Sequence, residues 1–216
     1  MSVLELVRRL PEPDVVRRVS RALAVLDLVL NEDASTRYYS FDARWSDTEE
    51  AALMRDGSGD EYSIVFSPAG TFAYGFDHES PMSPYANGMQ PWPGLLDGVP
   101  DVFHEQRDDK AFSDDGVPRA TVCFWRTTDD DAWRCGPVEN ARTDGADELF
   151  ELVADGRPEA YLTFAEEYYE VALDLEPIRY VYALMPLTEY VVTSLNRGRR
   201  LSDLKESIAE IGYPRS

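Results

Sequence analysis

Residues 60–77 read DEYSIVFSPAGTFAYGFD, and this stretch decides the fold class. Large apolar side chains occupy every second position on both sides of Ser67-Pro-Ala-Gly70, which is typical of strands that bury one face. These side chains are Tyr62, Ile64, Phe66, Phe72, Tyr74 and Phe76. Because Ser-Pro-Ala-Gly favours a tight turn, the stretch predicts two antiparallel strands joined as a hairpin.

The sequence on the N-terminal side of this hairpin extends it into a meander. Tyr39, Phe41 and Ala43 alternate with polar residues and predict a strand. Residues 50–56 fit a helix or a strand by pattern, but the short spacing favours a strand. The following Asp56-Gly-Ser-Gly-Asp60 is a strong turn signal. We therefore expect an antiparallel meander.

A second hairpin is predicted over residues 120–138. Its two apolar runs flank an acidic tip at 129–131. A three-residue loop at 128–130 would place Trp125 opposite Trp133. The same register would place Cys123 opposite Cys135, on the same face. A two-residue loop would break both pairings.

Helices are expected at both ends of the chain. Residues 1–30 have helical periodicity, interrupted at Pro11 and Pro13, and residues 145–212 are helical again. Helices, then strands, then helices predict an α+β fold rather than an alternating parallel one. We expect one α+β domain over 1–216, mainly β over 37–138, with helices packed on an antiparallel sheet. Within it, residues 80–119 are rich in proline and glycine and predict a long loop, which in a compact domain is often functional.

The chain is strongly acidic. Its 216 residues include 41 acidic and 21 basic side chains, for a net charge of −20 and a pI near 4.4. This charge argues against nucleic acid and against anionic membranes as partners, since both need a cationic face.

The acidity is concentrated in the middle of the chain. Residues 31–196 carry 34 acidic and 11 basic side chains, a net charge of −23, whereas residues 1–30 and 197–216 are slightly basic. The basic ends could pack on the acidic body, or the charge could serve solubility alone. The other interpretation is an acidic face that meets a basic protein.

The sequence predicts a cytoplasmic protein. Two cysteines are too few for a disulfide scaffold, and residues 1–9 lack the pattern of a signal peptide. The longest apolar stretch, residues 22–30, is interrupted by Asp27 and is far too short for a membrane span. We therefore expect reduced thiols.

The motifs of the common enzyme and cofactor sites are missing. The chain has no Gly-x-Ser-x-Gly, no phosphate-binding loop, no His-Glu-x-x-His and no Cys-x-x-Cys. Asp56, Ser58 and Asp60 resemble the start of a calcium loop. However, Glu61 and Ser67 stand where glycine and glutamate are needed, so a turn explains them better. No cofactor and no metal are expected.

The most suggestive cluster is Asp77-His78-Glu79, at the end of a predicted strand and the start of the long loop. Strand alternation would place the Asp77 and Glu79 carboxylates on one side and His78 on the other. The flanking carboxylates should raise the pKa of His78. Such an imidazole could transfer protons or bind a metal. The competing interpretation is a histidine that anchors the loop by hydrogen bonds.

Aromatic residues offer a second kind of candidate. Trp92 lies between two prolines in the long loop and could either anchor an interface or plug the loop against the core. A further aromatic stripe has helical spacing and predicts core packing. Its members are Tyr161, Phe164, Tyr168, Tyr180 and Tyr182.

Four stretches together carry a resemblance. They are MRDGSGDEY (54–62), GFDHES (75–80), PWPGLLDG (91–98) and IGYP (211–214). With them the chain resembles a family of uncharacterised bacterial proteins with the same layout over most of its length. It has a looser likeness, in charge and architecture, to bacterial toxin-immunity proteins, which are small acidic cytoplasmic α+β proteins that block basic toxins.

Two functions follow as hypotheses. The first is a non-enzymatic acidic module that binds a basic protein, for example as an inhibitor or immunity protein. Asp77, His78, Glu79 and Trp92 are its candidate binding residues. The alternative is a small-molecule or metal-dependent enzyme that uses Asp77, His78 and Glu79 beneath the loop 80–119. Asp77-His78-Glu79 therefore matters to both hypotheses.

Overall fold

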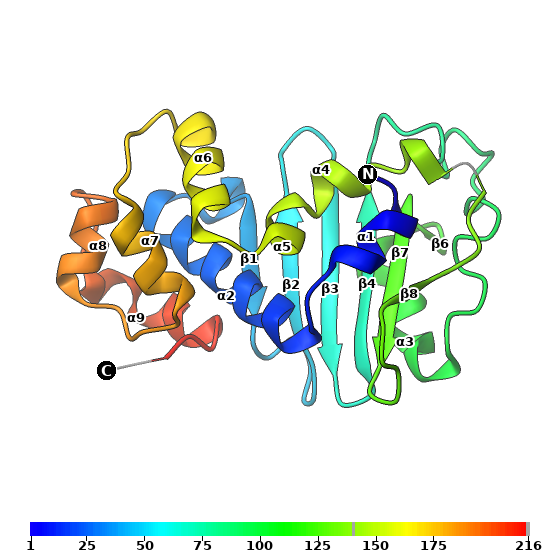
Figure 1. Cartoon of the computed structure of the whole chain (residues 1–216), viewed down its shortest axis with the longest axis horizontal. Helices are drawn as coiled ribbons and strands as arrows, with labels where there is room; N and C mark the ends of the chain where they lie inside the picture. Colours follow the sequence, from blue (N-terminus) through cyan, green and yellow to red (C-terminus); the bar gives the residue numbers. More distant parts are fainter. Residues whose placement is uncertain (140, 215–216) are drawn as a thin grey trace.

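The computed structural model describes residues 1–139 and 141–214, and its centre is an antiparallel sheet of six strands in the order β1-β2-β3-β4-β7-β8 (Figure 1). These strands are β1 (Tyr39–Asp42), β2 (Glu50–Arg55), β3 (Glu61–Ser67), β4 (Gly70–Phe76), β7 (Val122–Thr127) and β8 (Arg134–Cys135). Two short strands, β5 (Ser113–Asp114) and β6 (Val117–Pro118), form a small separate sheet.

The predicted meander is confirmed as β1 to β4, with residues 50–55 as a strand. In β3 and β4, Tyr62 lies opposite Gly75 and Ile64 opposite Ala73. Their side chains share one face of the sheet, where Phe150 stacks on Tyr62 at 4.8 Å. Alternate residues such as Phe72 point to the other face. The alternation in residues 60–77 therefore marks two covered faces rather than one.

Helices from both ends of the chain pack on the sheet. In the view of Figure 1, α1 (Val3–Arg9), α2 (Pro13–Leu30), α4 (Ala146–Leu149) and α5 (Glu151–Asp155) lie in front of the strands. The other helices lie beside the sheet, to the left of β1, and are α6 (Pro158–Tyr169), α7 (Leu175–Tyr182), α8 (Glu189–Leu195) and α9 (Leu201–Glu210). Of these, α7, α8 and α9 contact α2, which itself lies along β1. The expected α+β fold with helices packed on an antiparallel sheet is thus confirmed.

The long loop 80–119 covers the back face. It contains α3 (His104–Arg107) and three-residue 3-10 turns at Asp101–Phe103 and Lys110–Phe112. Similar short turns lie at Ala34–Thr36 and Ala141–Thr143. The Phe103 ring packs 5.7 Å from Phe72, and the Tyr74 hydroxyl donates to the Arg107 carbonyl over 3.1 Å. The loop is therefore a covering layer of the fold.

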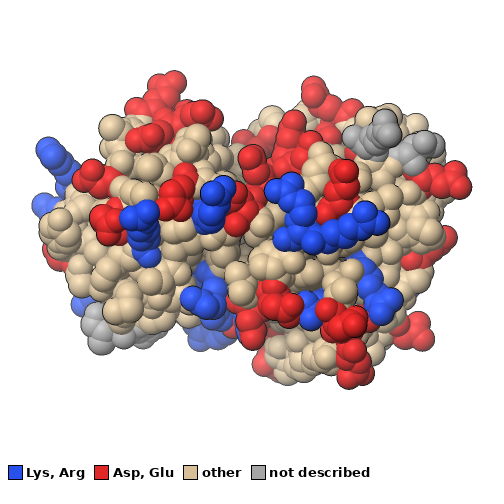
Figure 2. All heavy atoms as spheres, viewed as in Figure 1, with Lys and Arg blue, Asp and Glu red and all other residues tan. Residues whose placement is uncertain are grey.

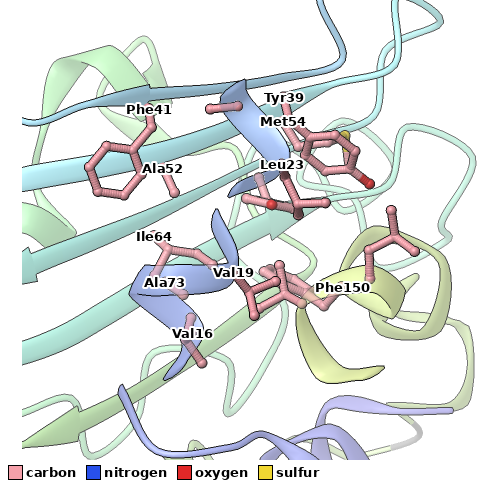
Figure 3. Packing of buried hydrophobic residues seen from close by; sticks show 14 of the residues in the cluster. Val16, Val19, Leu23, Tyr39, Phe41, Ala52, Met54, Ile64, Ala73 and Phe150 are labelled. Atoms are coloured by element: carbon pink, nitrogen blue, oxygen red, sulfur yellow. The ribbon is translucent and has the colours of Figure 1, made fainter. Parts of the chain in front are cut away.

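The core lies between α2 and the sheet. Val16, Val19 and Leu23 of α2 point at Ile64 and Ala73 of the central strands (Figure 3). The apolar stripe of α2 passes through Val16, which is fully buried, and not through its neighbour Val15, which is 38% exposed. A helix with these contacts on both sides couples the sheet to α7, α8 and α9.

The expected register of the second hairpin is wrong by one residue. Phe124 pairs with Cys135 and Trp125 with Arg134. Within the turn, the Asp130 carboxylate accepts hydrogen bonds from the backbone N–H and the hydroxyl of Thr127. Cys123 and Cys135 consequently lie on opposite faces of the sheet, and both are free thiols.

The basic N-terminal region does pack on the acidic body. Arg17 and Arg21 of α2 form ion pairs with Glu50 of β2. The N-terminal amine pairs with Asp147 over 2.8 Å. Within the residues that the structure describes, no helix combines the length and apolar character that a membrane crossing requires.

Candidate functional site

The sequence-predicted cluster lies where two turns meet at one edge of the sheet. The first turn, Asp56–Asp60, joins β2 to β3, and the second, Asp77–Ser80, follows β4. Because β3 and β4 are paired, the two turns are neighbours. We call these two turns the His78 corner.

The Asp77 carboxylate stabilises the second turn. Its Oδ1 accepts hydrogen bonds from the backbone N–H of Glu79 (2.9 Å) and of Ser80 (3.1 Å). Its own N–H donates to the hydroxyl of Thr121. Gly145, at φ +81°, packs so tightly on Asp77 that a Cβ there would collide with it. This carboxylate is therefore largely committed to holding the chain.

His78 serves the first turn. Its Nδ1 and its backbone N–H both contact Oδ1 of Asp60, at 2.7 and 2.9 Å. The ring also packs on Gly59, whose φ of +129° favours glycine. The hydrogen bond to Asp60 raises the pKa of His78, with smaller contributions from the charges of Glu79 and Asp56. The expected direction is correct, but the main cause is Asp60, a residue 18 positions away.

The expected placement of the three side chains is wrong. β4 ends at Phe76, so strand alternation does not extend to Asp77, His78 and Glu79. Asp77 and His78 lie on the same side, beside Asp60, and Glu79 is exposed outside this group.

Asp60, Asp77 and His78 can be considered as metal ligands. One ligand atom from each lies within 4.8 Å of the others. A metal would have to replace the proton shared by His78 and Asp60, and Oδ1 of Asp77 is already occupied by two N–H groups. The donor set is one that a divalent cation accepts, but its first role is to hold both turns.

The calcium-like stretch is a turn, as preferred from the sequence. Oδ1 of Asp56 accepts hydrogen bonds from the N–H groups of Ser58, Gly59 and Asp60. Burial alone would raise the pKa of Asp56, but these donors and the Ser58 hydroxyl lower it below its ordinary value.

Trp92 packs inward. It is half-buried against the core cluster, and its Nε1 donates to the carbonyl of Glu139 over 3.1 Å. Of the two interpretations of Trp92, the structure favours the plug over the interface anchor.

An aromatic surface lies beside the His78 corner, and no sequence pattern predicted it. Tyr38 precedes β1, and its ring centroid lies 5.0 Å from Phe164 and 5.1 Å from Tyr168, both on α6. Phe164 and Tyr168 stack at 5.4 Å, and Tyr168 is 42% exposed. We call Tyr38, Phe164 and Tyr168 the tyrosine ledge. The prediction that the helical aromatic stripe is core holds for Tyr161 and is wrong for Tyr168.

A buried carboxyl lies under the ledge. Asp27 of α2 is fully buried and accepts hydrogen bonds from the Tyr39 N–H (2.8 Å) and the Tyr161 hydroxyl (3.2 Å). Burial raises its pKa to about 6, against the opposing effect of these donors. Burial and then the charge of Asp56 raise the pKa of Tyr38 to about 12, so that its phenol stays neutral.

Carboxylates surround the ledge. Glu166, Glu167 and Glu170 are exposed at the C-terminal end of α6, and Asp56 is close enough to act on both Tyr38 and Tyr168. Figure 2 shows acidic side chains at the top of the molecule, over α6, and again along its lower right edge, with basic side chains across the middle. The ledge is thus an aromatic surface in an acidic setting.

No family model, curated protein or solved structure matches the chain. The resemblance to a bacterial family and to immunity proteins therefore stays a prediction.

Proposed function

We propose that the chain is a non-enzymatic module that binds a basic partner protein at the tyrosine ledge. The observation that carries the proposal is the exposed ring of Tyr168, stacked on Phe164 and edged by carboxylates. Tyrosine and arginine are common interface anchors. An arginine of the partner could stack on Tyr168 while the exposed Glu167 and Glu170 neutralise its charge.

The state of the His78 corner favours this function over catalysis. Asp77 and Asp56 spend their carboxylates on backbone N–H groups, and His78 is held by Asp60. Binding would place the acidic surface against a protein of opposite charge, which also speeds association. An inhibitor or immunity protein that blocks a basic toxin would have this chemistry. We place the protein in the cytoplasm, in keeping with its two free thiols.

The test is affinity capture with the full chain as bait in a lysate of the cells that make it. We expect a basic protein to be captured in a fixed ratio at low salt and to be lost at high salt. Tyr168→Ala should lower its recovery at least about tenfold. Tyr190→Ala is the matched control, because Tyr190 is 77% exposed on α8. Equal recovery with both variants, or capture of no basic protein, would contradict the proposal.

A metal-dependent enzyme remains the second candidate, because Asp60, Asp77 and His78 converge within 4.8 Å. Glu79, which was predicted to belong to the enzyme site, is not among these three residues. Calorimetric titration of the purified chain with Mn²⁺ and Zn²⁺ tests it. Saturable binding that His78→Ala abolishes would favour the enzyme, and a flat titration would exclude it.

A further inference from the structure

A groove on the back face of the sheet holds two arginines around one glutamate. It has a volume of about 440 Å³ and is lined by β2, β3 and the long loop. A smaller, deeper pocket continues it over Leu53, Ser63 and Phe112. The groove falls within the size range of small-molecule sites. Besides two glycines of the Asp56–Asp60 turn, its lining consists of Arg55, Asp60, Glu61, Phe76, His78, Tyr85 and Arg119, and we call it the two-arginine groove.

Hydrogen-bond donors outnumber acceptors in this groove. Arg119 contacts Oε1 of Glu61 through Nη2, whereas Nε of Arg55 is 3.6 Å from Oε2, beyond good hydrogen-bond length. One carboxylate cannot satisfy two guanidinium groups with five N–H donors each. The Nε of Arg119 is buried and has no hydrogen-bond partner among residues 1–139 and 141–214. The Nε of Arg119 therefore lacks an acceptor.

The charge around the groove favours an acceptor with a single negative charge. The two guanidinium groups face the carboxylates of Glu61 and Asp60, and Asp114 holds the Tyr85 hydroxyl beside them, so the groove itself has no excess of positive charge. The rest of the chain is strongly acidic, with a net charge of −20 overall. A dianion would be repelled by that field more strongly than a monoanion.

The wall of the groove is aromatic. The ring of Phe76 lies 5.8 Å from that of Tyr85 in an edge-to-face arrangement, and Tyr85 is 50% exposed. Its hydroxyl is held by Asp114 over 3.0 Å, which fixes the ring. A flat apolar group could pack against this wall while its charged end reaches the arginines.

We propose that the two-arginine groove binds a small aromatic monocarboxylate. The carboxylate accepts hydrogen bonds from Arg119 and Arg55, because planar guanidinium groups match its geometry. The ligand carboxylate replaces Glu61 as the partner of Arg55. The ring of the ligand packs on Phe76 and Tyr85. The groove contains no residue of the tyrosine ledge, so this inference is independent of the proposed function.

The test is calorimetry or protein NMR on the full chain with benzoate as the probe. We expect benzoate to bind with a Kd on the order of 1 mM. Benzamide, which has the same shape without the charge, should bind at least about tenfold more weakly. Inorganic phosphate should bind more weakly than benzoate. Tighter phosphate binding, or no benzoate binding, would overturn the inference.

Variants locate the site. Arg119→Gln should weaken benzoate binding at least about tenfold. Arg134→Gln is the matched control, because Arg134 is an exposed arginine that pairs with Asp130 on β8, at the far edge of the sheet. Arg55→Gln is the second variant in case Arg119→Gln fails to fold, since the Arg55 side chain is 67% exposed. Unchanged benzoate binding in folded Arg119→Gln, or in Arg55→Gln where Arg119→Gln does not fold, would overturn the inference.

Discussion

The tyrosine ledge lies beside the turn Asp56–Asp60 of the His78 corner, but the two regions satisfy their polar groups in different ways. The corner uses mainly local hydrogen bonds, which Asp56 and Asp77 accept from N–H groups two to four residues further on. The ledge rests on Asp27, whose partner Tyr161 is 134 residues away. Local hydrogen bonds occupy the polar groups of the corner. The long-range packing under the ledge, by contrast, leaves the ring of Tyr168 exposed.

Their carboxyl groups show the same contrast. Hydrogen bonds lower the pKa of Asp56 although it is partly buried, while complete burial raises that of Asp27 to about 6. N–H donors around a carboxyl near the surface stabilise its ionised form. Burial under aromatic rings stabilises the protonated form instead. Each of the three predictions below perturbs one side of this contrast.

The largest effect is expected at Asp27. The pKa of this carboxyl is about 6 in the native state and 3.8 ordinarily. The native state therefore binds more protons than the unfolded state between about pH 4 and pH 6. The contribution of Asp27 to stability is present below pH 4 and is lost as the pH rises through 6. At ~1.4 kcal/mol per pKa unit, this loss is on the order of 3 kcal/mol. Urea denaturation across this pH range measures it.

Asp27→Asn isolates this contribution. An amide can accept from the Tyr39 N–H and donate to the Tyr161 hydroxyl, so the packing is kept without a titrating group. We expect the variant to lose less stability than the wild type as the pH rises. Asp144, also buried with its pKa raised to about 6, continues to titrate in both chains and cancels in the comparison. Parallel curves for the two chains would show that Asp27 is not desolvated.

An intermediate effect is expected from Asp77→Ala at the corner. The variant removes the acceptor of the Glu79 and Ser80 N–H groups, as the loss of a helix cap does, and should cost about 1–2 kcal/mol of unfolding free energy. Glu79→Ala, at the exposed neighbour, is the matched control and should change little. Partner binding at the tyrosine ledge should be the same in both variants. A loss of binding in Asp77→Ala alone would mean that the corner and the ledge act together.

More of the His78 corner than of the tyrosine ledge could be predicted from the sequence. Alternating residues, turn residues and proline breaks act over a few positions, so they predicted the meander, the helices and the turn at Asp56. The cluster at Asp77 and His78 was also found, because its members are adjacent in the chain. The contact between His78 and Asp60 was not predicted, because only the pairing of β3 with β4 brings Asp60 to His78.

The ledge had no such local signal. Tyr38 and Tyr168 are 130 positions apart, and helical spacing alone cannot tell a stripe that ends at the surface from one that stays in the core. The hairpin register failed for a related reason. The conformation of its turn sets the register, and a change of one residue there moves every pair, whereas the apolar residues of the strands do not specify the turn.

The smallest effect is expected at His78, because its contact with Asp60 is partly exposed and therefore screened by solvent. Asp60 raises the pKa of His78 above its ordinary 6.5 in the native state. The contact therefore stabilises the fold below pH 6.5, and this contribution is lost as the pH rises through the native pKa. We expect His78→Ala to be less stable than the wild type in mild acid and to approach it in mild alkali. His104→Ala, at the other histidine of the chain, is the control variant, since its ring contacts a backbone carbonyl rather than a carboxylate. NMR titration of the His78 ring gives the direct measurement, and Asp60→Asn should shift its midpoint down towards 6.5. A midpoint at or below 6.5 in the wild type would show that the imidazole does not hold the turn, and would leave His78 free for the chemistry of the alternative function.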